Sequence, residues 1–201
     1  MEWDGYEGWV TQPQIKEVSE KDYHEIISTD TIISSDIINY VSSHDNLLFP
    51  ILIGSDLRVL EKLNHTFDGE TYSPKPNKKK LSKTAFMYLN SPYLWGGRTP
   101  LGIDCSGFTQ IVYKINGVKL SRDAHQQANQ GQTLSFIEES EAGDLAFFDD
   151  SEGKIVHVGL LLENHCIIHA HGTVRIDQID QTGIYNGSAH THKLRMIKKL
   201  I

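Results

Sequence analysis

Apolar residues at spacings of three and four predict two helices, over residues 82–89 and 104–113. Ser82 is suited to cap the first helix, because its hydroxyl can accept a bond from a free backbone N–H. The second helix places Cys105 in its first turn. The apolar positions that define the two helices are Leu81, Ala85, Phe86, Leu89, Phe108, Ile111 and Val112.

Strands are predicted after these helices. The run Gly143-Asp144-Leu145-Ala146-Phe147-Phe148 is typical of a turn that leads into a strand, and two more apolar segments, 154–162 and 165–172, predict further strands. No internal repeat or coiled-coil heptad is present. Helices followed by a run of strands predict an α+β fold with an antiparallel sheet.

The first part of the chain is predicted to be rich in β-structure. Residues 18–45 are polar and β-branched without a clear period, and the apolar run 47–53 suits a buried strand. Aromatic residues and glycines at short spacing over 3–10 predict a tight turn between strands. The motif Asp4-Gly5-Tyr6-Glu7-Gly8-Trp9-Val10 resembles a late strand-turn-strand of bacterial SH3-like domains, so the opening strands of such a barrel would be missing here.

A segment rich in proline and lysine, 74–80, separates the two parts. It has no apolar residue to anchor it in a core, which is typical of a linker or an exposed loop. We therefore predict an SH3-like region over 1–73, a linker over 74–80 and a second domain over 81–201.

The charge balance excludes some partners. The chain has 19 basic and 26 acidic residues and a formal net charge of −7. A surface without a basic excess does not suit nucleic acid or anionic membranes, whereas a small cationic substrate would fit it. The sequence has no apolar run long enough to cross a bilayer and starts without a secretion signal, so we expect a cytoplasmic location, or a periplasmic or secreted one if an N-terminal segment is missing.

Cys105 is the candidate nucleophile. Free N–H groups at the start of a helix favour negative charge, so the predicted position should make the thiol of Cys105 more acidic. Asp104 is placed to cap this helix, and Gly102 and Gly107 would let a substrate carbonyl come close.

Two histidines are placed to serve this thiol. If 155–161 and 165–171 pair around a turn at 162–164, His157 lies directly opposite His169. One imidazole could then take the thiol proton while the other fixes its orientation. His165 and His171 would share the same face, and His171 is an alternative third member.

Other roles for the cysteines and histidines are less favoured. Cys166 is expected to be a small buried hydrophobic residue, because Ile167 and Ile168 follow it. The histidines and cysteines have none of the spacings of zinc sites. We therefore expect no metal and no cofactor.

Five motifs together resemble the NlpC/P60 family of cell-wall peptidases, in family order and spacing. They are Tyr93-Leu94-Trp95-Gly96-Gly97, Asp104-Cys105-Ser106-Gly107-Phe108, Gly143-Asp144-Leu145-Ala146-Phe147-Phe148, His157-Val158-Gly159 and Ile167-Ile168-His169-Ala170. The resemblance implies a papain-like α+β core. It also implies that Cys105 is the nucleophile, His157 the base and His169 the polar residue that orients the base.

With the SH3-like motif in front, the chain is most similar to γ-D-glutamyl-L-diamino acid peptidases. The resemblance implies cleavage of muropeptides after a free N-terminal L-Ala-γ-D-Glu, and a substrate pocket formed by Tyr93, Asp104, Ser106, Arg122 and Asp123. Asp104 and Asp123 would bind the ammonium group of this substrate. Ala124 and His125 stand where small hydroxyl residues are common in the subgroup, and Tyr6 or Glu7 is the candidate pocket residue of the SH3-like part.

Two other functions remain open at this stage. The chain could be a peptidoglycan-binding module without activity, although Cys105, His157 and His169 speak against it. It could also be a thiol acyltransferase or an amidase on the same scaffold, because residues near the nucleophile do not report the acyl acceptor.

Overall fold

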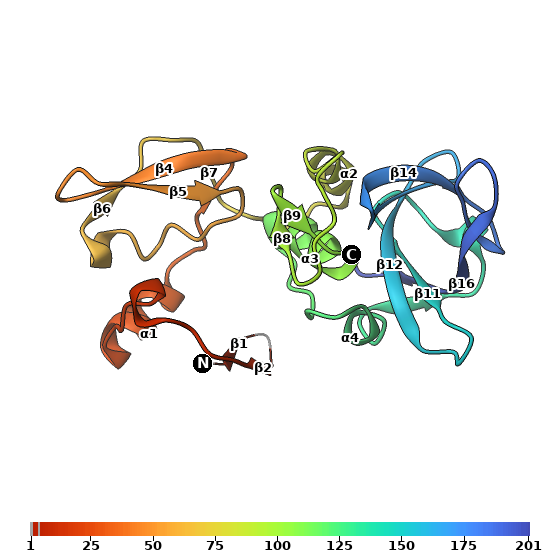
Figure 1. Cartoon of the computed structure of the whole chain (residues 1–201), viewed down its shortest axis with the longest axis horizontal. Coiled ribbons are helices and arrows are strands. Elements are labelled where there is room, and N and C mark those ends of the chain that lie inside the picture. Colours follow the sequence, from red (N-terminus) through yellow and green to blue (C-terminus); the bar gives the residue numbers. More distant parts are fainter. Residues whose placement is uncertain (1, 4) are drawn as a thin grey trace. The chain divides into compact units, whose positions relative to one another are not determined.

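The computed structural model describes residues 2–3 and 5–201, and the chain divides into two units, one up to Pro74 and one from Lys75 on. Each unit is described by itself. Helix α2 (Lys78–Phe86) begins inside the segment predicted as a linker, and its N-cap is Asn77 rather than Ser82 (Figure 1). Lysine is a good helix former, and Lys78 is held by Asp144 at 2.7 Å, which explains the earlier start.

The described residues of the first unit form short strands, one α-helix and two 3₁₀ turns. Its strands form three small antiparallel sheets, in the orders β1–β2, β3–β7 and β5–β4–β6. The elements are β1 (Glu2–Trp3), β2 (Tyr6–Glu7), η1 (Gln12–Gln14), α1 (Glu20–Ser28), β3 (Ile33–Ser34), β4 (Ile38–Ser43), β5 (Leu48–Leu52), η2 (Glu61–Leu63), β6 (His65–Thr66) and β7 (Thr71–Tyr72).

Two predictions for this unit are wrong in part. Residues 20–28 form helix α1, because Ser19 caps it by accepting a bond from the backbone N–H of Asp22 at 3.1 Å. Tyr23, Ile26 and Ile27 stand at helical spacing within it, but none of its residues is buried. Strand β5 exists but is not buried, since 61% of Leu48 is exposed.

The SH3-like assignment of this unit stays a prediction. Strands β1 and β2 pair antiparallel on either side of the predicted turn, with Trp3 opposite Tyr6. Asp4, which belongs to the motif, lies outside the described residues. The pocket role expected of Tyr6 or Glu7 also stays a prediction.

The second unit has the predicted α+β order, with helices first and strands after them (Figure 1). None of the helices among the described residues is long and apolar enough to span a bilayer. After α2, the elements are β8 (Arg98–Thr99), β9 (Gly102–Ile103), α3 (Cys105–Ile115), α4 (Ala124–Gln127), β10 (Gln132–Leu134), η3 (Ile137–Glu139), β11 (Leu145–Asp149), β12 (Ile155–Leu162), β13 (Cys166–His171), β14 (Thr173–Ile179), β15 (Gly183–Tyr185) and β16 (His190–Lys199).

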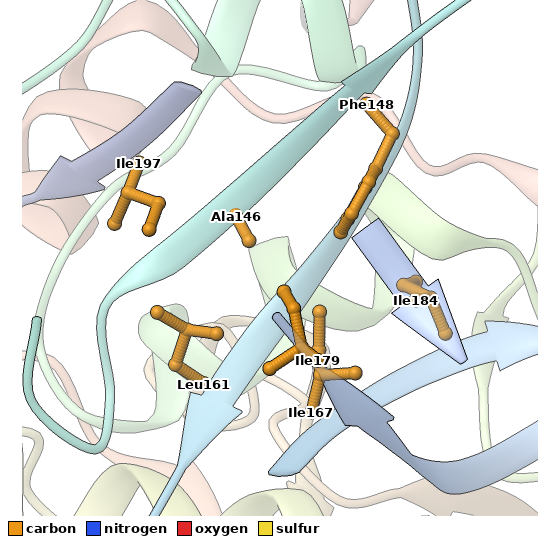
Figure 2. Close-up of a cluster of buried hydrophobic side chains, with 7 residues drawn as sticks. All are labelled: Ala146, Phe148, Leu161, Ile167, Ile179, Ile184 and Ile197. Carbon is orange, nitrogen blue, oxygen red and sulfur yellow. The ribbon is translucent and has the colours of Figure 1, made fainter. Parts of the chain in front are cut away.

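The seven-stranded antiparallel sheet of this unit closes on itself. Its order is β10-β16-β11-β12-β13-β14-β15, and β15 also pairs with β16, so the six strands from β11 to β16 form a ring. One core fills the inside of this ring, and Figure 2 shows its side chains. They are Ala146, Phe148, Leu161, Ile167, Ile179, Ile184 and Ile197.

Helix α3 packs on the other face of β12 and β13. Alternate residues of β12, such as Val158 and Leu160, are fully buried there. His157 has the same parity as Leu161 and belongs to the inner face, as His169 does with Ile167.

The hairpin of β12 and β13 differs from the predicted register by two residues. Leu161 pairs with Ile167, and the turn is Glu163-Asn164-His165. Asn164 (φ 59°) and His165 (φ 55°) both adopt left-handed backbone conformations, which asparagine tolerates better than most residues. The prediction that His165 lies on the strand face is therefore wrong. A shift of two residues keeps each side chain on its face, so His157 and His169 still share one.

Candidate active site

Cys105 is the first residue of α3, as predicted. Asp104 caps the helix, and its Oδ1 accepts a bond from the backbone N–H of Gly107 at 2.6 Å. A Cβ atom on Gly107 would come within 2.3 Å of the carbonyl oxygen of Gly97, so the chain can pass this close only with a glycine. The loop around Gly97 is thereby held against the start of α3.

The thiol of Cys105 is not acidic, and this prediction is wrong. Burial and the negative charge of Asp104 raise the pKa of the thiol to about 11. The backbone N–H groups of Val158, Ser106 and Cys105 act in the opposite direction and are outweighed. The thiol is therefore protonated at neutral pH and needs a base.

The thiol of Cys105 contacts the backbone N–H of Val158, the residue that follows His157 in β12. The hydrogen-bonded ladder between β12 and β13 ends at the pair of Leu160 and Ile168. Residues 157 and 158 pair with β11. The start of α3 therefore lies against the same part of β12 that carries His157, whose side chain has the parity of the inner face.

His157 and His169 are hydrogen-bonded to each other. Nε2 of His157 lies 2.9 Å from Nδ1 of His169, and both residues are buried, with 5% and 0% of their surface exposed. Since Nε2 is engaged, Nδ1 is the nitrogen with which His157 can take the thiol proton. Burial lowers the pKa of both imidazoles, so both are neutral at neutral pH.

Gly159 makes the diagonal contact between these histidines possible. In the observed register Gly159 lies opposite His169, and a Cβ atom on Gly159 would come within 2.9 Å of the Cβ of His169. The missing side chain leaves room for His169 to reach His157, two residues along β12. The predicted pair is therefore formed, but not directly across the hairpin as expected.

Two further histidines surround this pair. The ring of His192 from β16 stacks on His157, with centroids 4.2 Å apart, and the ring of His171 lies 6.4 Å from that of His157. The nitrogen that bonds His157 belongs to His169 and not to His171, the alternative third member. His192 is not among the residues predicted from the sequence, because strand β16 was not predicted.

Asp177 binds His169 behind the pair of His157 and His169, and it was not predicted from the sequence either. Its Oδ2 lies 3.0 Å from Nε2 of His169, and its Oδ1 accepts a bond from Arg175 at 2.7 Å. The alternation of polar and apolar residues over 173–177 could have revealed strand β14. His169 pairs with Arg175 in the sheet, so Asp177 is its diagonal neighbour.

Among the predicted substrate residues, Asp104, Ser106 and Arg122 bind one another. Arg122 donates to both carboxylate oxygens of Asp104, at 3.0 and 2.5 Å, and to Oγ of Ser106 at 3.0 Å. The backbone N–H of Gly96 also donates to Asp104, at 2.8 Å. The carboxylate of Asp104 is therefore occupied within the protein.

Tyr93 and Asp123 are more open. Burial and the charges of Cys105 and Asp104 raise the pKa of Tyr93. Asp123 is the N-cap of α4, and 32% of its side chain is exposed. Gln127 of that helix donates to the carbonyls of Ser106 and Ser121, which ties the segment that carries Asp123 to α3.

The structure corrects the expectation for the second cysteine. Cys166 is only partly buried, and its thiol donates to the carbonyl of Asn164 at 3.6 Å. Both cysteines are free. Across residues 2–3 and 5–201, no group of three or more histidine, cysteine or acidic side chains is arranged to hold a metal ion.

The family model of NlpC/P60 matches residues 90–193, which include the thiol and all four histidines of this site. The chain belongs to the NlpC/P60 family. Its α+β fold agrees with that of an NlpC/P60 family protein from Bacillus cereus, with a TM-score of 0.79 over 98% of this chain and 70% of the other, at 23% identity.

The chain is also similar to curated peptidases. The NlpC/P60 chain is 33% identical over 132 residues to a γ-D-glutamyl-L-lysine dipeptidyl-peptidase of Bacillus cereus, covering 64% of this chain. It is 40% identical over 98 residues to the protein of the same name from Bacillus subtilis, covering 48% of this chain. These alignments span only 39% and 33% of the relatives.

Asp104→Asn should make the thiol of Cys105 more acidic. The amide keeps the helix cap but removes the negative charge that helps to raise the thiol pKa to about 11, so this pKa should fall. The rate of alkylation of Cys105 by iodoacetamide against pH, measured in a Cys166→Ala background, gives the value. Asp180→Asn changes a carboxylate that follows the end of β14 and takes no part in raising the thiol pKa, so it should leave the curve of alkylation rate against pH unchanged. An unchanged curve for Asp104→Asn would contradict the assigned cause.

Proposed function

We propose that this NlpC/P60 protein is a cysteine peptidase that hydrolyses the γ-D-glutamyl–diamino acid bond of muropeptides with a free N-terminal L-Ala. The observation that carries the proposal is the bond of 2.9 Å between His157 and His169, beside a thiol that contacts the backbone of Val158. The relatives named γ-D-glutamyl-L-lysine dipeptidyl-peptidases support the substrate class.

Cys105 forms and breaks the covalent bond in the proposed reaction. His157 takes the thiol proton at Nδ1 while the sulfur attacks the γ-carbonyl carbon of D-Glu. The backbone N–H groups at the start of α3 can donate hydrogen bonds to the resulting oxyanion. The C–N bond then breaks, the proton passes from His157 to the leaving amine, and a thioester remains.

Water completes the cycle. His157 takes a proton from the water as it attacks the thioester, the C–S bond breaks, and the proton returns to the sulfur. Because the resting thiol has a pKa of about 11 and burial keeps His157 neutral, the base acts during the attack rather than by maintaining a thiolate beforehand.

Asp123 is the proposed partner of the substrate ammonium. Asp104 is bound by Arg122 and two backbone N–H groups. The side chain of Asp123 is 32% exposed, so a substrate ammonium can reach it. A charge-assisted bond of this kind would explain a requirement for a free N-terminus. Tyr93 and Ser106 would border the same pocket.

Acetylating the substrate amine is expected to lower kcat/KM by about 10- to 100-fold, the value of one charge-assisted hydrogen bond. L-Ala-γ-D-Glu-L-Lys and its N-acetyl form are incubated with the protein, and the released dipeptide is measured by mass spectrometry. Asp123→Asn should slow cleavage of the free peptide by a similar factor and leave the acetylated peptide unaffected.

These results separate the proposal from its alternatives. Equal rates for the two peptides would exclude the ammonium contact, and no release from either would exclude the peptidase. Transfer of the dipeptide to added amines in preference to water would instead indicate an acyltransferase.

A further inference from the structure

A continuous line of polar contacts runs behind the base. It leads from His157 to His169 at 2.9 Å, from His169 to Asp177 at 3.0 Å, and from Asp177 to Arg175 at 2.7 Å. Side chains of three neighbouring strands, β12, β13 and β14, contribute to it. Asp177 binds His169 and Arg175, so its link to the base His157 runs through His169.

Asp177 is well buried and carries a charge. Only 7% of its side chain is exposed. Burial opposes ionisation, but the bonds from Arg175 and His169 outweigh it and lower the pKa of Asp177. At neutral pH the residue is a carboxylate, which accepts hydrogen bonds and donates none.

This carboxylate determines where the protons of the two histidines lie. Nε2 of His169 must carry a proton in order to donate to Asp177, and a neutral imidazole has only one. Nδ1 of His169 is then an acceptor, so the contact of 2.9 Å requires a proton on Nε2 of His157. Nδ1 of His157 is left with a lone pair, as a base for the thiol of Cys105 requires.

We propose that Asp177 is a positioning residue that fixes His169 as the Nε2–H tautomer and thereby keeps Nδ1 of His157 free to accept the thiol proton. The catalytic part of this inference rests on the proposed function. When His157 becomes an imidazolium, the same carboxylate also stabilises the positive charge through His169.

Arg175 holds this arrangement in one orientation. Its guanidinium binds Oδ1 of Asp177, which directs Oδ2 towards His169. In Asp177→Asn the guanidinium would retain the amide oxygen, so the NH₂ group would face Nε2 of His169. His169 would then change to the Nδ1–H tautomer and donate to Nε2 of His157, and the remaining proton of His157 would block its Nδ1.

Asp177→Asn is therefore expected to lower kcat by roughly 10²- to 10⁴-fold with little change in KM, since it reverses the tautomers without touching the substrate. Ring ¹H–¹⁵N spectra of ¹⁵N-histidine-labelled full chain at pH 7 report the tautomers directly. The wild type should show His169 as Nε2–H, and the variant should show it as Nδ1–H.

Asp180→Asn is the matched control. It removes the carboxylate of another histidine–aspartate pair, in which Nε2 of His190 lies 3.0 Å from Asp180 at an exposed position. Its kcat and the spectra of His157 and His169 should equal those of the wild type. A general effect of losing a carboxylate would appear in both variants.

Three outcomes would overturn the inference: a wild type with His169 as Nδ1–H, an Asp177→Asn variant with wild-type kcat, or a variant that loses kcat while both rings keep their tautomers. If the variant does not fold, the wild-type spectrum decides. The spectra need no substrate, so a protein that cleaves no muropeptide would refute the proposed function without affecting this test of the tautomers.

Discussion

Replacing Cys105 with alanine is expected to lower kcat on a muropeptide tripeptide by about 10⁴- to 10⁶-fold, because no other group can form the thioester. The fold should survive. Only 7% of Cys105 is exposed, and removing a single buried sulfur should change the free energy of unfolding by about 1 kcal/mol. Release of dipeptide by mass spectrometry and unfolding in urea measure the two effects.

Cys166→Ala is the control for this prediction. Its thiol is also free, but it lies at the start of β13, where it donates to the carbonyl of Asn164. This variant should keep wild-type kcat. If Cys105→Ala retained turnover, or if both variants lost it equally, Cys105 would not be the nucleophile.

Replacing Arg122 with methionine is expected to reduce the free energy of unfolding by about 3–5 kcal/mol. The side chains of Arg122 and Asp104 are only 12% and 7% exposed, and the guanidinium binds both carboxylate oxygens. Removing Arg122 leaves the buried charge of Asp104 without its cation, with the backbone N–H groups of Gly96 and Gly107 as partners, and this costs much more than the pair itself contributes. Urea denaturation measured by circular dichroism gives the free energy.

Lys199→Met provides the comparison at the surface. Lys199 lies 3.4 Å from Glu141, and the two side chains are 42% and 62% exposed. Solvent screens such a pair, so its loss should cost no more than about 1 kcal/mol. Equal costs for the two variants would mean that the ion pair of Arg122 and Asp104 does not stabilise the start of α3.

Local signals in the sequence located helix α3 of the second unit but not helix α1 of the first. Helix α3 begins at Cys105, one residue after the predicted start, because Asp104 is a strong N-cap and the apolar residues behind it follow a clear period. Helix α1 also has a cap, but its apolar residues at helical spacing are limited to Tyr23, Ile26 and Ile27, and polar and β-branched residues surround this short pattern.

The pKa of the Cys105 thiol was predicted from only one of the effects that act on it. The backbone N–H groups at the start of α3 do favour the thiolate, as expected. Burial and the charge of Asp104 oppose it and prevail, and both depend on how the rest of the chain packs around Cys105. A helix position alone does not determine the balance.

The sequence by itself determined the family, the cap and position of Cys105, and the common face of His157 and His169, because capping and the alternation of a strand are local properties. Only the tertiary structure decided the register of the hairpin, the contact of Asp177 with His169 and the burial of the thiol. Each of these depends on which strands and helices come together, and residues far apart in the chain meet there through packing that no single segment encodes.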